Sequence, residues 1–152
     1  MATPEEEQAK LNYELAVYKE QVALIKRETE RISLTTIDLS NALTTVENFK
    51  KKGEEKPMLV PIGGGAMIKG SMSDTKILVP IGAEYLMEME REDAIKELQK
   101  RIDATKKAVE KLTSEFNKIA EKLRETTGHL KKLQTESKLS ERVDENIRED
   151  YI

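Results

Sequence analysis

Only a few residues of this chain have types and spacing that could do chemistry. The glycine-rich stretch at residues 65–71, GAMIKGS, has the two glycines of a phosphate-binding loop. Ser71, however, stands where that loop requires Lys, and Gly70 lies inside a strand pattern with no helix after it. Residues 63–65 are three glycines that fit a hairpin turn, because glycine adopts positive φ angles without steric cost. We therefore expect no bound nucleotide and no other cofactor.

The remaining reactive residue types do not form a catalytic group. His129 is the single histidine, and it falls at a solvated helix position with no cluster of metal-ligand residues. The chain has no cysteine, which excludes disulfides, thiolate nucleophiles and thiolate metal sites. Carboxylates are abundant, but they lie at ion-pair spacing on wet helix faces, as Glu121 does beside Arg124. The sequence predicts a protein that is not an enzyme and holds no metal.

The composition favours long, thin helices over a thick core. Hydrophobic residues make up 38% of the chain, charged residues 36% and aromatic residues 4%, which suits helices that each bury one narrow stripe. The net charge of -3 mixes both signs, so no nucleic-acid partner is expected. No apolar run approaches the ~20 residues that span a bilayer, and the acidic first ten residues lack the apolar core of a signal peptide. These features predict a cytoplasmic protein with no membrane contact.

The first expected element is a helix within residues 1–53. Thr3, Pro4 and Glu6 form a helix-start signal with a capping box. The run of three lysines at 50–52, followed by Gly53, is interpreted as the helix end. Between these signals, apolar or Thr residues recur at steps of four and three, the heptad repeat of a coiled coil: Leu11, Leu15, Tyr18, Val22, Ile25, Thr29, Ile32, Thr36, Leu39, Leu43 and Val46.

A second helix is expected over residues 90–152, with a matching stripe that runs from Ile95 to Leu133 and then turns polar. We expect the end of this helix, from about residue 134, to fray or to depend on a partner. The simplest way for each helix to find a partner is to fold back on the other helix of the same chain as an antiparallel coiled coil. If Val46 meets Ile95, then Thr36 falls opposite Thr105 and the second helix overhangs the first. The threonine layer either fixes the register or merely tolerates a wet seam, and the sequence favours neither interpretation.

Between the helices, residues 54–89 change to the two-residue period of strands. Leu-Val-Pro-Ile-Gly occurs at 59–63 and again at 78–82, so this segment is a duplicated β-hairpin. Two small hairpins have exposed edges and too little core to stand alone, so we infer that they mediate oligomerisation. The expected interface residues are apolar strand positions: Val60, Ile62, Ile68, Ile77, Val79, Ile81, Tyr85 and Met87.

This order of elements resembles the alpha class of prefoldin subunits. The resemblance covers nearly the whole chain, and its most specific part is residues 58–94, including the LVPIGGG stretch at 59–65. It implies a mainly α fold in which the hairpins of two alpha-type and four beta-type subunits build a β-barrel platform bearing six coiled coils. It further implies an ATP-independent holdase that captures unfolded proteins at the coiled-coil tips and passes them to a group II chaperonin.

On this sequence the tips carry both termini. The expected client-binding residues are off-stripe or overhanging apolar positions, together with the first stripe residues: Leu11, Tyr13, Val17, Tyr18, Ile147, Tyr151 and Ile152. Exposed apolar groups suit promiscuous capture, although scattered surface apolar residues are also ordinary. Two other functions stay open: a structural coiled-coil adaptor with one defined partner, and a chain that assembles with itself into homo-oligomers or filaments.

Overall fold

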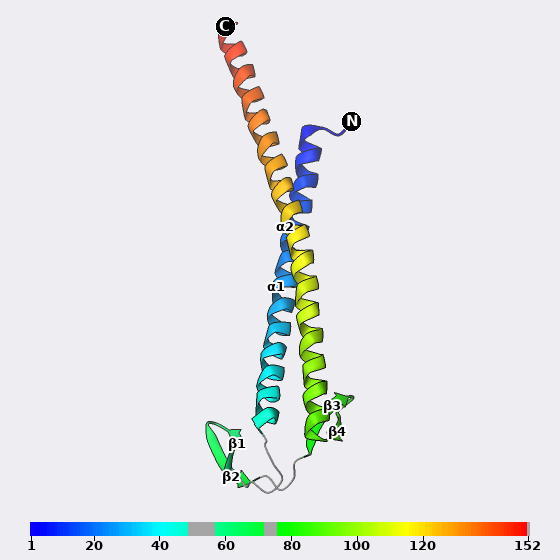
Figure 1. Ribbon diagram of the computed structural model, residues 1–152. Coiled ribbons are helices and arrows are strands. Elements are labelled where there is room, and N and C mark those ends of the chain that lie inside the picture. Colours follow the sequence, from blue (N-terminus) through cyan, green and yellow to red (C-terminus); the bar gives the residue numbers. More distant parts are fainter. Residues whose placement is uncertain (49–56, 72–75, 152) are drawn as a thin grey trace. The chain divides into compact units, whose positions relative to one another are not determined.

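A computed structural model describes residues 1–48, 57–71 and 76–151. The order of elements is α1 (Pro4–Asn48), β1 (Pro57–Gly63), β2 (Ala66–Ser71), β3 (Ile77–Gly82), β4 (Tyr85–Met89) and α2 (Arg91–Asp150), as Figure 1 shows. The expected fold class, two long helices around two β-hairpins, is confirmed as far as one chain can show it. The assembly of the hairpins into a barrel stays a prediction. Neither described helix contains an apolar stretch long enough to cross a lipid bilayer.

The chain divides into two compact units. The helical unit comprises Met1–Arg31 and Ala108–Ile152, and the hairpin unit comprises Ile32–Lys107. Both helices contribute to both units, whereas all four strands belong to the hairpin unit.

In the helical unit, the start of α1 has the expected capping box. The Thr3 amide donates to Glu6 Oε2 at 3.0 Å, and the Glu6 amide donates to Thr3 Oγ1 at 3.2 Å. Two exposed amides at the helix start are thereby satisfied reciprocally. At the other end, α1 is described to Asn48, and the predicted stop at 50–53 lies outside the described residues.

The two helix segments of the helical unit run antiparallel. Glu7 lies beside His129, while Lys26 sits over the ring of Phe116, 6.0 Å from its centroid. Moving forward along α1 therefore means moving backward along α2. The seam between them buries Leu11 on α1 and Leu130 on α2, which are 8% and 9% exposed. Burial of these stripes supplies the apolar contact that neither helix could find alone.

Within the hairpin unit, the two helix segments pair in the register that their heptad stripes predict. Thr36 Oγ1 lies 2.8 Å from Thr105 Oγ1, which confirms the predicted threonine layer. Each hydroxyl also lies near a carbonyl of its own helix, at 2.9 Å for Thr36 to Ile32 and 2.7 Å for Thr105 to Ile102. The two hydroxyl groups have only two protons for these three contacts. A hydroxyl can therefore donate to the other threonine only when it does not donate to the carbonyl of its own helix.

An arginine of α2 caps the end of α1. Arg91 Nε donates to the carbonyl of Val46 at 3.1 Å, and Arg91 Nη2 donates to that of Glu47 at 2.7 Å. The last carbonyls of a helix have no partner within it and carry the negative end of its dipole. The cation satisfies both requirements and links the start of one helix to the end of the other. Sequence analysis had assigned no role to Arg91.

The two hairpins have the same internal geometry. Val60 pairs with Ile68 in the first, and Val79 with Met87 in the second. Each has a register shift after its proline, between Pro61 and Gly63 and between Pro80 and Gly82. Both strand pairs are separate two-stranded sheets, so every strand is an edge, where a proline without an amide proton is tolerated.

The turns of the hairpins differ in residue type but share one backbone conformation. Gly64 and Gly65 have φ angles of 58° and 79°, and Ala83 and Glu84 have φ angles of 48° and 63°. Two consecutive positive φ angles define the tight turn that matches the twist of a hairpin. The second hairpin therefore holds two side chains in a conformation that glycine would adopt at lower cost.

Candidate functional site

The second hairpin is docked on the helices of its own chain. Val79 is 2% exposed and shares a core cluster with Val46, Ala94 and Leu98. Arg101 of α2 fastens the outer part of the hairpin, because its Nη2 donates to the carbonyl of Pro80 at 2.6 Å. Pro80 has no amide proton, so its carbonyl is the only backbone hydrogen-bonding group of this residue, and Arg101 is its partner. The hairpin is thus held by an apolar contact and a charged hydrogen bond.

The first hairpin presents the same pentapeptide to solvent. Val60, which occupies the position of Val79 in the repeat, is 46% exposed, and Ile62 and Ile68 are 60% and 53% exposed. Along β1 and β2 every residue is exposed except Met58, which is half-buried. The two copies therefore differ at their valine, which lies in a core in the second hairpin and is exposed in the first.

These placements separate the eight predicted interface residues. Val79 lies in the core of its own chain, and Ile77 packs against that core with partial exposure. The docking of the second hairpin buries Val79 within one chain, and its expected role between subunits stays a prediction. The other six residues are exposed: Val60, Ile62, Ile68, Ile81, Tyr85 and Met87.

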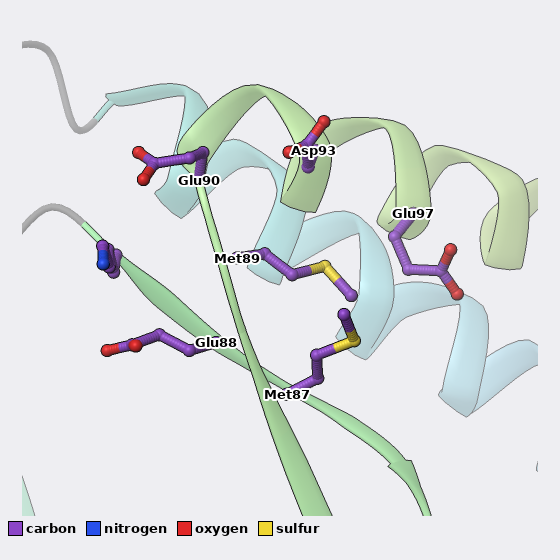
Figure 2. A pocket seen from close by; sticks show the side chains of 7 residues that line it. Met87, Glu88, Met89, Glu90, Asp93 and Glu97 are labelled. Atoms are coloured by element: carbon purple, nitrogen blue, oxygen red, sulfur yellow. The ribbon is translucent and has the colours of Figure 1, made fainter.

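A shallow cavity of about 390 Å³ lies where β4 leads into α2. Figure 2 shows Met87 and Met89 with their sulfur ends close together, while Glu88 and Glu90 extend away from them. Asp93 and Glu97 of α2 complete the labelled lining. No group of three or more potential ligand side chains among the described residues is arranged to hold a metal ion. The lining also includes Lys76, so the charged groups at this cavity are one lysine and four carboxylates.

The predicted tip residues fall into three groups. Leu11 is buried in the seam, and Val17 and Tyr18 are half-buried along α1. Tyr13, Ile147 and Tyr151 are exposed, at 72%, 50% and 88%. Ile152 lies outside the described residues. The structure therefore brings an exposed apolar surface to the end of α2 and leaves Leu11 a packing role in this chain.

The end of α2 extends past the start of α1 in the helical unit. Leu133 is the last half-buried residue of α2, and residues 134–151 are all exposed. The helix nevertheless continues to Asp150, so its backbone is regular where sequence analysis expects fraying. The fraying itself stays a prediction.

Two further exposed residues of this segment had escaped sequence analysis. Leu139 and Val143 are 55% and 54% exposed and precede Ile147 and Tyr151 at steps of four. The heptad stripe passes instead through polar positions such as Ser140 and Asp144. The signal that could have revealed them is the change of period from 3.5 to 4 at the point where the partner helix ends.

His129 has no arrangement suited to chemistry. Its Nε2 lies 3.6 Å from Glu7 Oε1, and both side chains are about half exposed, at 54% and 44%. A contact of this kind between exposed side chains contributes little to stability. It marks the register of the two helices and is no base–nucleophile pair.

The arrangement defines a class of protein: a helical-hairpin subunit that joins its helices through two small β-hairpins and exposes apolar residues on a hairpin and at a helix end. Residues 18–136 match the family model of the prefoldin subunit. The alpha subunit of prefoldin from Pyrococcus horikoshii is 30% identical over 142 residues, which cover 92% of this chain and 96% of that protein. The alpha subunit from Thermococcus onnurineus is 35% identical over 104 residues, covering 67% and 71%.

The chain belongs to the prefoldin family and is therefore a chaperone subunit and not an enzyme. The fold agrees with that of a solved chain from filamentous PFD of Methanocaldococcus jannaschii. That comparison has a TM-score of 0.66 at 24% identity and covers 78% of this chain and 98% of the other.

Proposed function

We propose that this chain is the alpha-type subunit of an ATP-independent holdase, which captures unfolded polypeptides at the ends of its helices. The observation that carries the proposal is the exposed end of α2, where Ile147 and Tyr151 are 50% and 88% exposed. An unfolded client offers apolar side chains in no fixed arrangement, so a surface on one unpartnered helix can meet many of them. Tyr13, also exposed, adds an apolar group on α1.

The first hairpin supports the proposed assembly. Its exposed apolar residues and unpaired strand edges suit strand pairing with further subunits. On this basis the chain would join beta-type prefoldin subunits as two alpha and four beta chains. The interface would use Val60, Ile62 and Ile68 of the first hairpin, with Ile81, Tyr85 and Met87 of the second. In the cytoplasm the assembly would deliver clients to a group II chaperonin.

The test is suppression of aggregation. Chemically denatured proteins of unrelated sequence are diluted into the chain with and without a beta-type partner, in the absence of nucleotide, and light scattering is followed. We expect several clients to be protected. A chain truncated after Ser137 should protect less, whereas a Lys10→Ala chain, changed on the exposed face of α1, should protect as the unchanged chain does. Absence of protection in a confirmed assembly would refute the holdase.

A second candidate is a chain that assembles with itself into homo-oligomers or filaments, and a structural coiled-coil adaptor for one defined partner is the remaining alternative. The observation that favours it is the first hairpin, whose exposed repeat could pair with that of another copy. Light scattering coupled to size exclusion distinguishes the two, since a self-assembling chain forms large particles without a beta-type partner. An adaptor would bind one folded protein at fixed stoichiometry and protect no unrelated clients.

A further inference from the structure

The duplicated hairpins have opposite charges at one equivalent position. Their LVPIG segments begin at residues 59 and 78, and the strand pairing is the same in both hairpins. Lys69 pairs with Leu59 in the first hairpin, and Glu88 pairs with Leu78 in the second. The same place in the repeat therefore has a cation in one copy and a carboxylate in the other.

Each of these charged side chains shares one face of its hairpin with apolar side chains. Side chains alternate between the two faces along a strand, and directly paired residues lie on the same face. The face that contains Lys69 is here called the lysine face, and the face that contains Glu88 is called the glutamate face. Their members are Leu59, Met67 and Lys69 on the lysine face and Leu78, Leu86 and Glu88 on the glutamate face.

Both faces are open to solvent. Their four apolar side chains are 55–63% exposed, and Lys69 and Glu88 are exposed as well. Among the residues that the structure describes, neither charged side chain forms an ion pair. Val79, on the other face of the second hairpin, is buried against the helices, and Figure 2 shows Glu88 extending away from Met87. The glutamate face is therefore directed away from the helices on which its hairpin is docked.

The charges decide which of these faces can pair with each other. Lys69 is the single charged residue of residues 57–71, whereas residues 77–89 contain Glu84 and Glu88 and no cation. Two lysine faces in contact would bring two cations together, and two glutamate faces would bring carboxylates together. Like charges in contact are unfavourable, and they select against such pairs. A lysine face and a glutamate face combine apolar contact with opposite charges.

We propose that the lysine face of one copy of this chain binds the glutamate face of a second copy. The apolar side chains of the two faces pack together, and Lys69 lies beside the partner's Glu88 at the edge of the contact. Because the two surfaces differ, the contact is heterologous, and association through it closes into a ring or continues as a chain. The inference rests on self-assembly, the second candidate function, and names the surfaces that would carry it. Val60 and Met87 lie on the opposite faces and stay available to other subunits.

The test measures association of the full-length chain with itself, without a beta-type partner, by sedimentation velocity over a range of concentrations. Lys69→Glu would place two carboxylates at the contact, and Glu88→Lys would place two cations there. Each reversal removes an attraction and adds a repulsion, so the dissociation constant should rise about twofold to thirtyfold. The double variant Lys69→Glu/Glu88→Lys has opposite charges again and should recover most of this loss.

A mixture of the two single variants tests whether the contact joins different chains. The first hairpin of the Lys69→Glu chain and the second hairpin of the Glu88→Lys chain have opposite charges at the contact. The mixture should therefore associate more tightly than either variant alone. If the double variant recovers but the mixture does not, the two faces meet within one chain and the proposal is overturned. An effect of only one of the two reversals would indicate pairing of like hairpins and would also overturn it.

Two control variants change the net charge by the same amount at exposed positions of α2. Lys96→Glu matches Lys69→Glu, and Glu92→Lys matches Glu88→Lys. Both controls should associate as the unchanged chain does. Effects equal to those of the face variants would show that only overall charge matters, and would refute the contact. Circular dichroism of each variant verifies that the helices are intact.

The same measurements separate this inference from the candidate function on which it rests. If the unchanged chain stays monomeric at every concentration, both self-assembly and the proposed contact are wrong. If it assembles but the reversals have no effect, self-assembly stands and the contact is wrong. Weaker binding of a beta-type partner by the two face variants, with unchanged association of the chain with itself, would assign the faces to that partner and overturn the proposal.

Discussion

The two copies of the repeat allow one substitution to be made in two environments. Val79→Ala removes two methyl groups from a side chain that is 2% exposed. The transfer of these groups from water contributes about 1.6 kcal/mol, and an incompletely closed cavity adds to the cost. We expect the docking of the second hairpin to weaken by about 1.5–2.5 kcal/mol in total. Val60→Ala is the matched control, since Val60 has the same sequence neighbours and is 46% exposed.

The assay is hydrogen exchange of the isolated chain, followed by mass spectrometry on peptides that cover β3 and β4. Since 1.4 kcal/mol corresponds to a factor of ten, amides of the second hairpin should exchange about 10–60 times faster in Val79→Ala. In Val60→Ala these amides should exchange within about twofold of the unchanged chain, because most surface substitutions change stability by no more than about 0.5 kcal/mol. Both variants are compared at one oligomeric state, verified by size exclusion. Equally faster exchange in the Val79→Ala and Val60→Ala chains would refute the inference that the second hairpin is docked and the first is not.

Three further variants test contacts within the hairpin unit, each by urea unfolding followed by circular dichroism. Thr36→Val with Thr105→Val should leave stability unchanged or raise it by about 1 kcal/mol, because both hydrogen-bond partners are replaced by apolar groups of similar shape; a loss above about 1 kcal/mol would contradict this. Arg91→Ala should cost about 2–3 kcal/mol by leaving two carbonyls without their charged donor, with Glu92→Ala as an exposed neighbour for comparison, and equal stability of the two would refute the cap. Ala83→Gly should stabilise by a few tenths up to about 1 kcal/mol, since its φ of 48° suits glycine; destabilisation would argue against a left-handed conformation at this turn.

The helices and the hairpins were predictable because their signals are local and repeated. The capping box at Thr3 and Glu6 depends on residues three apart, and the heptad stripe of α1 is sustained over many turns. The register that places Thr36 beside Thr105 follows from counting both stripes from one turn, and the 2.8 Å contact between the hydroxyls confirms it.

The exposure of the predicted tip residues followed only partly from the sequence, and their role in client binding stays a prediction. Ile147 and Tyr151 were expected at an unpartnered end, and both are exposed. Leu139 and Val143 were missed because continuing the heptad leads past them, and the heptad has meaning only while a partner helix is present. Leu11 was assigned to client binding, but its stripe position is covered by α2.

Sequence by itself determined the class of the molecule: two heptad helices, a duplicated hairpin, and neither cysteine nor a catalytic cluster. Tertiary structure alone decided which copy of the repeat has a buried valine, because two identical pentapeptides give the same prediction of burial. Val79 is covered and Val60 is not because β4 passes into α2 through Glu90 alone, which holds the second hairpin against Ala94 and Leu98. Likewise, only the fold brings Arg91 to carbonyls 44 and 45 positions earlier in the chain.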